Sequence, residues 1–302
     1  MKFRYFISIV AVAMSFSDNI YAREGEDQYL SLQTEIEDYI DKSRAEVGVA
    51  VIIGDKDTVV VNNGRYPMNS VLKLYQLLPT ARALSERHIL LDSVVSVSRG
   101  DLDPDTWSSM LNDYPADTVI ETTYRKLMEY AVGQSDNNAC DVLFDRVCPI
   151  AEVVAFWRGK GIDDFSICWN EAEMHANPSL SNDNWTTPLA AAEVIAYMMP
   201  YSLYSSDYNT SQVSGFLTGC LTGVNRIPKP LARSGAIIAH KTGTGFNDAD
   251  GFPTGINDVA YIILPDGRHY TLAVFVKSSR RDIKGTEQII ADISEIVYRY
   301  CL

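Results

Sequence analysis

The sequence predicts an α/β plus all-α fold, in which one mixed β-sheet is assembled from both ends of the chain and a helical domain is inserted between its halves. Runs rich in β-branched residues occur near both ends, and the stretch from Ser70 to about Tyr208 follows helical spacing. Sheets and helices each bury an apolar face, so the two kinds of segment form separate layers. We expect a discontinuous α/β domain of residues 23–66 and 212–302, and an all-helical domain of residues 67–211.

The amino-terminal part of this sheet domain predicts a helix followed by a β-hairpin. Apolar residues recur at helical spacing between Tyr29 and Ile40. The runs Gly48–Ile53 and Thr58–Val61 are rich in β-branched residues and flank the turn-forming segment Asp55–Asp57.

The carboxyl-terminal third predicts three strands and a helix. The strands are expected at Ala236–Ala239, Val259–Leu264 and Thr271–Val276. The turn Pro265–Arg268 pairs the last two strands as a hairpin. A final helix begins near Thr286, where isoleucines recur at helical spacing.

The composition is that of an ordinary globular protein, and it excludes several classes of protein and of binding partner. The 302 residues are 46% hydrophobic and 22% charged, which excludes collagen-like, low-complexity and wholly disordered chains. The net charge of −13, without a basic cluster, argues against a nucleic-acid partner. Four histidines and five cysteines show no metal-binding spacing, so no metal or other cofactor is expected. We interpret the cysteines as structural, and His88 and His240 as packing or surface residues.

The first 22 residues have the features of a secretory signal peptide. Lys2 and Arg4 supply positive charge, Phe6–Phe16 is apolar, and the small residue Ala22 ends the segment. No apolar run reaches the ~20 residues that a membrane span needs. We expect cleavage after Ala22, a periplasmic protein without membrane association, and an oxidising compartment that permits disulfides. The odd number of cysteines leaves at least one unpaired.

The first motif with chemical content is Ser70-Val71-Leu72-Lys73, at the start of an apolar helical stripe. Residues three apart share a helix face, so Lys73 would lie beside the Ser70 hydroxyl. A serine becomes a nucleophile when a neighbouring base takes its proton. A helix start also directs free N–H groups at an oxyanion.

Two further triplets follow in the chain. Ser135-Asp136-Asn137 lies at a predicted helix-to-loop junction, although the same triplet at residues 17–19 shows that it means little alone. Lys241-Thr242-Gly243 follows the strand predicted at Ala236–Ala239, where a cation, a hydroxyl and bare backbone can face a ligand carboxylate.

In order, spacing and setting, these S-x-x-K, S-D-N and K-T-G motifs resemble those of the serine β-lactamases and penicillin-binding proteins. The resemblance covers nearly the whole mature chain, including the segments Leu102–Ser108, Gln134–Asn138 and Leu264–Arg268. It implies a transpeptidase-like fold with an antiparallel sheet flanked by helices, and a small-molecule β-lactam as substrate. We expect a monomer.

One residue points to the class A β-lactamases within this group. Residues 161–185 are polar and aperiodic and predict a long, Ω-like loop, which in a compact domain is often functional. Glu171 in this loop resembles the class A glutamate that activates the deacylating water, with Glu173 as a solvated neighbour. The form E-A-x-M-H resembles the cephalosporinase-leaning, extended-spectrum branch of the Bacteroides type. His175 and Trp169 depart from the Asn and Arg that most class A enzymes have at these places.

The resemblance also implies roles in catalysis. Ser70 attacks the lactam carbonyl, and its N–H and that of Thr244 form the oxyanion hole. The acylation base is either Lys73 or Glu171 acting through a water. Ser135 relays a proton to the leaving nitrogen, and the Glu171-activated water hydrolyses the acyl-enzyme.

Eight residues are expected to bind substrate: Asn137, Lys241, Thr242, Gly243, Thr244, Trp107, His175 and Arg226. Asn137 would bind the amide side chain, and Lys241 with Thr242 the carboxylate. Arg226 matches a helper arginine of some class A enzymes, the alternative being an ordinary surface arginine. Trp107 forms a wall of the site or, alternatively, packs partly buried.

Two other functions remain open from the sequence. A D-alanyl-D-alanine peptidase uses the same serine machinery, although Glu171 and the compact size argue against it. A penicillin-binding sensor would keep Ser70 and Lys73 but be acylated once without turnover.

Overall fold

The computed structural model describes residues 28–54, 57–114 and 119–302. The predicted signal peptide of residues 1–22 lies outside this part of the chain. Residues 28–43 form the first helix, as predicted, and a five-stranded sheet follows with strand order β2-β1-β10-β9-β8. Its strands are β1 (Glu46–Ile53), β2 (Asp57–Val61), β8 (Ile237–Thr244), β9 (Gly255–Ile263) and β10 (His269–Lys277).

The sheet joins the two ends of the chain. Strand β1 pairs with β10, so that Ala50 lies opposite Ala273, and every neighbouring pair in the sheet is antiparallel. The sheet is therefore antiparallel, as the family resemblance implies, and not mixed. Both predicted hairpins, β1–β2 and β9–β10, are confirmed.

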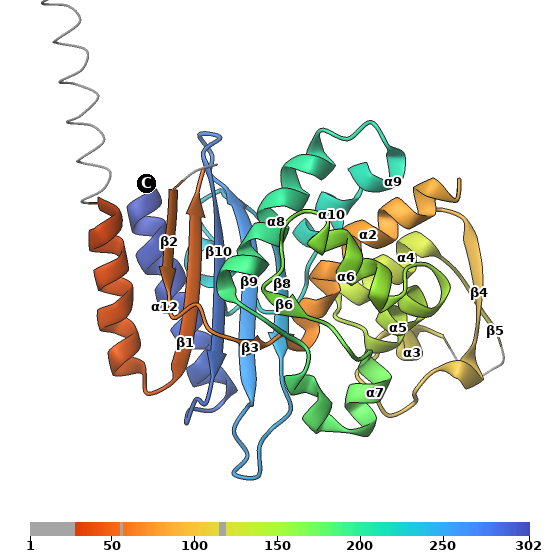
Figure 1. Cartoon of the computed structure of the whole chain (residues 1–302), viewed down its shortest axis with the longest axis horizontal. Helices are drawn as coiled ribbons and strands as arrows, with labels where there is room; N and C mark the ends of the chain where they lie inside the picture. The colour runs from red at the N-terminus through yellow and green to blue at the C-terminus, as the bar shows by residue number, and fades with distance from the viewer. Residues whose placement is uncertain (1–27, 55–56, 115–118) are drawn as a thin grey trace, which may run out of the picture.

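Helices cover both faces of the sheet (Figure 1). One face packs against the first helix and α12 (Ile283–Cys301) in a cluster of buried aliphatic side chains. The other face packs against α8 (Pro188–Leu203), behind which lies the helical half of the molecule. Because both faces of the sheet are covered, nearly every residue of β9 and β10 is buried, and both strands are largely apolar.

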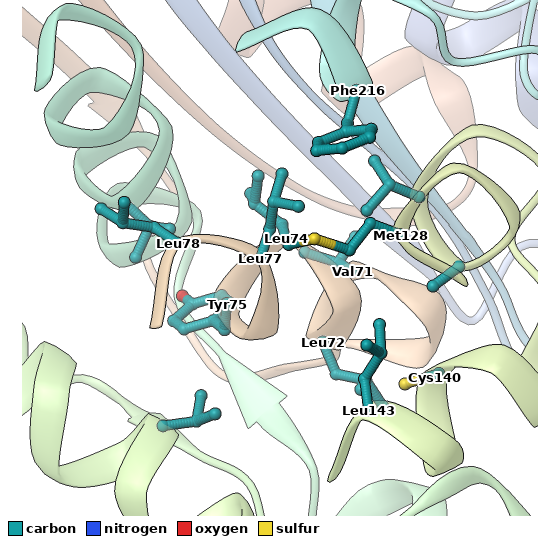
Figure 2. Close-up of a cluster of buried hydrophobic side chains, with 14 of the residues drawn as sticks. Val71, Leu72, Leu74, Tyr75, Leu77, Leu78, Met128, Cys140, Leu143 and Phe216 are labelled. Atoms are coloured by element: carbon teal, nitrogen blue, oxygen red, sulfur yellow. The ribbon is translucent and has the colours of Figure 1, made fainter. Parts of the chain in front are cut away.

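The helical half is built around α2 (Leu72–Glu86), which is buried on almost all sides. Figure 2 shows its side chains, among them Leu74 and Leu77, packed with Met128 and Phe216 from other helices. The remaining helices are α3 (Met110–Asp113), α4 (Tyr124–Met128), α5 (Asn137–Arg146), α6 (Ile150–Arg158), α7 (Glu171–Ala176), α9 (Tyr208–Ser211), α10 (Val213–Thr218) and α11 (Pro228–Leu231). Short 3₁₀ turns are η1 (Asn69–Val71), η2 (Arg99–Asp101) and η4 (Pro178–Asn182), and η3 (Glu129–Gly133) is a π-helix.

Residues 67–211 are not all helical, which corrects the prediction. Strands β4 (Val94–Ser98) and β5 (Val119–Thr123) pair antiparallel within this range, and alternate residues of each strand are buried on one face and exposed on the other. Strands β3 (Tyr66–Pro67), β6 (Phe165–Ser166) and β7 (Trp185–Thr186) form a small second sheet. The division into two domains remains a prediction.

Two other expectations also need correction. Strand β8 continues to Thr244, so Lys241-Thr242-Gly243 lies within the strand and pairs with β9 instead of following its end. Residues 161–185 contain α7 and η4, whose few residues are too short a span for helical periodicity to be visible in the sequence.

Candidate active site

Ser70 lies in η1, immediately before α2. Its neighbour Asn69 has a φ of +48°, a left-handed conformation that turns the chain sharply into the helix. Lys73 follows one turn later, and its Nζ is 3.1 Å from Ser70 Oγ. The helix start thus brings a hydroxyl and an amine together, as the spacing predicts.

Lys73 is fully buried and is surrounded by oxygen atoms. Its Nζ donates to Ser135 O at 2.9 Å and to Asn137 Oδ1 at 2.7 Å. It also forms an ion pair of 2.7 Å with Glu171 Oε1. A buried ammonium needs such partners, and they place one proton-bearing nitrogen between the serine and the glutamate.

The S-D-N segment is held by its central residue. Asp136 is fully buried, caps α5 by accepting from Ala139 N at 2.9 Å, and accepts from Met110 N at 2.7 Å. Ser135 has a φ of +60°, so the chain turns sharply here. With Asp136 fixed, the Ser135 carbonyl and the Asn137 side chain both accept from Lys73, while the Ser135 hydroxyl accepts from Lys241.

Glu171 begins α7 and is 7% exposed. Asp141 on α5 holds this helix start, because its carboxylate accepts from Glu171 N at 2.9 Å and from Ala172 N at 2.8 Å. Burial raises the pKa of Asp141 to about 7, against the two N–H groups, which lower it. Glu173 is exposed and completes a capping box with Asn170.

Hydrogen bonds from uncharged groups join the two ends of the loop that carries Glu171. Trp169, which stands where the family resemblance implies an arginine, donates from its indole Nε1 to Asp183 Oδ2 at 3.0 Å. The Asn184 side chain accepts from Cys168 N and Trp169 N and donates to Trp169 O. These bonds fix the loop without a salt bridge at Trp169.

Strand β8 forms the opposite wall. Lys241 is fully buried, and its Nζ donates to Ser135 Oγ and to Thr242 O, both at 2.9 Å. Burial lowers the pKa of Lys241 to about 7. A Cβ on Gly243 would lie 2.6 Å from Met68 O, so only glycine lets β8 approach η1 this closely.

Arg226 is buried, which excludes the alternative of an ordinary surface arginine. Its guanidinium donates to Gly243 O at 3.0 Å, to Asn257 O at 2.9 Å and to Thr244 Oγ1 at 2.7 Å. An ion pair of 3.1 Å with Glu287 completes its contacts. Arg226 therefore links Gly243 and Thr244, at the end of β8, to Asn257 on β9 beside the cavity.

A cavity of about 500 Å³ opens between these walls. It is lined by nine of the predicted site residues, namely Ser70, Trp107, Ser135, Asn137, Glu171, His175, Arg226, Thr242 and Thr244. Lys73, Lys241 and Gly243 do not line it and lie behind its walls. Trp107 is 68% exposed with its Nε1 bonded to Gln134 O, so it is a wall and not a buried packing residue.

The cavity has further lining residues that the sequence reasoning did not select: Asn69, Asp105, Thr106, Met174, Ser181, Thr222, Gly245 and Phe246. Most adjoin a motif in the chain, which is the signal that could have found them. Thr222 has no such signal in the sequence. The same is true of Asp141, which lies outside the cavity lining, because the contacts of both residues form only in the folded chain.

The described ranges contain no cluster of His, Cys, Asp or Glu that could hold a metal. None of the helices within them is long and apolar enough to cross a membrane. All five cysteines are free thiols.

Residues 31–301 match a family model described as "Beta-lactamase enzyme family". The chain belongs to the β-lactamase family. A β-lactamase of Phocaeicola vulgatus is 41% identical over 84% of this chain and 79% of its own. The extended-spectrum β-lactamase PER-1 of Pseudomonas aeruginosa is 32% identical over 89% of this chain and 87% of its own.

Solved structures of class A β-lactamases share this fold. A representative from Bacteroides cellulosilyticus has a TM-score of 0.84 at 30% identity, covering 90% of this chain and 98% of its own. The TLA-3 extended-spectrum β-lactamase also has a TM-score of 0.84, at 32% identity over 89% of this chain and 98% of its own. This chain is accordingly a class A serine β-lactamase with the transpeptidase-like fold.

Proposed function

We propose that this β-lactamase hydrolyses β-lactam antibiotics, penicillins and cephalosporins among them, through an acyl-enzyme on Ser70. One observation carries the proposal. Lys73 Nζ lies 3.1 Å from Ser70 Oγ and 2.7 Å from Glu171 Oε1, and both Ser70 and Glu171 line a cavity of about 500 Å³. A nucleophile, an amine and a carboxylate in such contact can both make and hydrolyse an ester.

In acylation, the Ser70 hydroxyl attacks the lactam carbonyl as its proton moves either to Lys73, once Lys73 has passed one of its own protons to Glu171, or to Glu171 through a water. The N–H groups of Ser70 and Thr244 stabilise the oxyanion, both residues lining the cavity. Ser135 then passes its hydroxyl proton to the lactam nitrogen and is reprotonated with the proton that Ser70 released. Lys241 Nζ, which donates to Ser135 Oγ at 2.9 Å, holds this hydroxyl in place.

Substrate binding uses the walls of the cavity. The Thr242 and Thr244 hydroxyls receive the substrate carboxylate, and buried Lys241 and Arg226 supply positive charge behind them. Asn137 bonds the amide side chain, and Trp107 and His175 border it. Gly243 contributes by letting β8 close against η1.

In deacylation, Glu171 takes a proton from a water that attacks the ester, and Ser70 recovers its proton. Removal of a general base typically costs ~10²–10⁴ in rate. The Glu171→Ala variant should therefore accumulate an acyl-enzyme, visible by intact mass after mixing with a cephalosporin. Glu173→Ala is the matched control and should turn over, and Ser70→Ala should gain no mass. Undiminished turnover by Glu171→Ala would contradict the assignment.

Intact mass and turnover, with a D-alanyl-D-alanine peptide as a second substrate, separate the two rival functions, which the family relatives do not favour. A penicillin-binding sensor would itself remain acylated without turnover. A peptidase would hydrolyse a D-alanyl-D-alanine peptide faster than a cephalosporin.

The location and oligomeric state belong to this proposal as well. The chain is exported to the periplasm, cleaved after Ala22, and acts there as a monomer without a nucleic-acid partner. The mass of the periplasmic protein should correspond to a chain that begins at Arg23, and sedimentation should give a single monomeric species. A retained leader or a stable dimer would contradict these points.

A further inference from the structure

Asn257 on β9 is paired with Gly243 in the register of β8 and β9. It is 1% exposed, and its amide nitrogen donates to Pro67 O at 2.8 Å and to Met68 O at 3.2 Å. Both partners are carbonyl oxygens, so the nitrogen of this amide, and not its oxygen, faces them. The side chain of Asn257 therefore joins β9 to the two residues that precede η1.

The missing side chain of Gly243 leaves room for this amide. A Cβ on Gly243 would lie 3.1 Å from Asn257 Nδ2 and 2.6 Å from Met68 O, which are the donor and the acceptor of one of these bonds. A larger residue at this position would separate the two groups. The amide of Asn257 thus reaches η1 past the backbone of β8 and contacts both segments.

The backbone of Asn257 is held together with the end of β8. Arg226 Nη1 donates to Asn257 O at 2.9 Å and to Gly243 O at 3.0 Å, and Arg226 Nη2 donates to Thr244 Oγ1 at 2.7 Å. One residue therefore has its side chain on the turn before Ser70 and its carbonyl in the group of contacts that holds Gly243 and Thr244.

The turn that the Asn257 side chain holds has a backbone conformation that needs support. Asn69 has a φ of +48°, and residues other than glycine keep such a conformation only where surrounding contacts impose it. Met68 O also accepts from Val71 N at 3.0 Å, which closes the turn of η1. The bonds from Asn257 therefore fix the backbone that sets the direction of the Ser70 N–H.

The Thr244 N–H lies on the side of β8 that faces away from β9. Gly245 N donates to Gly255 O on β9 at 2.8 Å, and hydrogen-bonded pairs alternate with non-hydrogen-bonded pairs along two antiparallel strands. Thr244, one residue earlier, is thus in a non-hydrogen-bonded pair, and it lines the cavity. The proposed oxyanion hole has one donor on η1 and one on β8, and Asn257 contacts both segments.

We propose that Asn257 is a positioning residue of the oxyanion hole, which fixes the separation of the Ser70 and Thr244 N–H groups. The inference rests on the function proposed above, in which these two groups stabilise the oxyanion. Asn257 does not line the cavity and acts through the two segments that it joins. Donors of this kind must lie ~2.7–3.1 Å from the oxyanion, so a small displacement of η1 from β8 weakens one of the two bonds.

The first test measures both chemical steps in the Asn257→Leu variant of the full mature protein, which keeps a branched side chain but cannot donate. Acylation and deacylation each form an oxyanion in the same hole, so both rate constants for a cephalosporin should fall together, by about 10- to 100-fold. Noncovalent affinity for the substrate, measured in the Ser70→Ala background, should stay unchanged, because the negative charge forms only during the reaction.

The second test is the infrared spectrum of the acyl-enzyme, which reports the oxyanion hole directly. In Glu171→Ala, which should accumulate this species, the frequency of the ester carbonyl falls as the hydrogen bonds to its oxygen strengthen. Addition of Asn257→Leu should move the band to higher wavenumber. A general loss of stability does not produce this shift in molecules that remain folded.

Asn209→Leu is the matched control. Asn209 on α9 is 2% exposed, its amide nitrogen donates to Ile89 O at 2.7 Å, and it does not line the cavity. The substitution should destabilise the protein but leave both rate constants and the carbonyl band unchanged. Asn257→Ser, whose hydroxyl is one bond shorter than the amide, is the second test variant if Asn257→Leu does not fold, and it should show the same losses.

A boronic acid tests the same hole without a β-lactam. Ser70 Oγ bonds to the boron of phenylboronic acid as its proton passes to the neighbouring base, and one oxygen on the tetrahedral boron occupies the hole. Asn257→Leu should weaken this binding by about 10-fold or more, whereas Asn209→Leu should not.

The outcomes separate this inference from the proposed function. Unchanged rate constants or an unmoved carbonyl band in Asn257→Leu overturn the inference while hydrolysis stands, and so do equal losses in Asn209→Leu. Equal boronate affinity in the two variants overturns it even if the protein hydrolyses no β-lactam.

Discussion

Lys73 Nζ lies 2.7 Å from Glu171 Oε1, and neither side chain is more than slightly exposed. The two residues come from α2 and α7, and their contact joins the helix that follows Ser70 to the loop that carries Glu171. A proton can move between the amine and the carboxylate without passing through bulk water. The contact therefore links the acylation and deacylation halves of the proposed cycle.

Lys73→Met tests the acylation half. We expect the rate of Ser70 acylation to fall by ~10²–10⁴, because the variant keeps the side-chain volume but cannot accept or donate a proton. Loss of the cation also leaves Glu171 buried without its ion-pair partner. Single-turnover acylation followed by intact mass measures the rate, with Lys284→Met, at an exposed position of α12, as control. An unchanged acylation rate would remove Lys73 from the mechanism.

Gly243→Ala tests the close approach of β8 and η1. Its Cβ would lie 2.6 Å from Met68 O, so the strand or the Ser70 turn must move. We expect a loss of about 1–3 kcal/mol in the free energy of unfolding and slower acylation. Gly215→Ala is the matched control, because its Cβ meets nothing within 4 Å in α10. Equal stability and equal rates in the two variants would show that the packing at Gly243 has no role.

Asp141→Asn tests a dependence of stability on pH. The pKa of Asp141 rises from 3.8 to about 7 on folding, so its ionisation opposes folding. This contribution favours the native state most below pH 4 and is lost as the pH rises through about 7. Relative to Asp141→Asn, the wild-type protein should lose about 4 kcal/mol of unfolding free energy between these limits, because the pKa rises by about three on folding.

Denaturant unfolding at a series of pH values measures this difference. Asp101→Asn, at an exposed position, is the control and should show no such slope. A constant difference between wild type and Asp141→Asn would mean that Asp141 ionises in the folded protein as it does in the unfolded chain. Deacylation should also slow in Asp141→Asn, since an amide has one acceptor oxygen for the two N–H groups of Glu171 and Ala172.

Trp169→Phe tests the closure of the Glu171 loop. The variant keeps an aromatic ring but loses the indole donor to Asp183, which should cost about 1 kcal/mol of local stability. Hydrogen exchange in residues 165–185 should become faster, and deacylation slower. Asp183→Asn retains an acceptor oxygen and should change exchange less. Unaltered exchange in Trp169→Phe would show that Asn184 closes the loop alone.

The sequence predicts those parts of the fold that depend on residues close together in the chain. Runs rich in β-branched residues mark β1, β9 and β10, and the spacing of Ser70 and Lys73 predicts their contact because both lie on one turn of helix. The start of α2 and the turn between β9 and β10 are predictable for the same reason.

The features of the fold and of the site that the sequence does not predict depend on contacts between residues far apart in the chain. The sequence does not reveal that Asp141 holds Glu171 or that Lys241 lies behind the wall instead of lining it. The sequence does not show that β8 extends beyond Ala239, because Lys241 and Thr242 are polar, although pairing with β9 keeps them in the strand. His240, interpreted as a packing or surface residue, is buried against Asp258 for the same kind of reason.

The pairing of Ala50 with Ala273 has a consequence for how the protein is made. A ribosome synthesises β1 near the beginning of translation and its partner β10 near the end. Until then β1 has only β2 beside it, and a two-stranded hairpin is at best marginally stable alone. Such long-range pairing slows folding. The complete sheet, and with it the wall that carries Lys241, can form only after nearly the whole polypeptide has emerged.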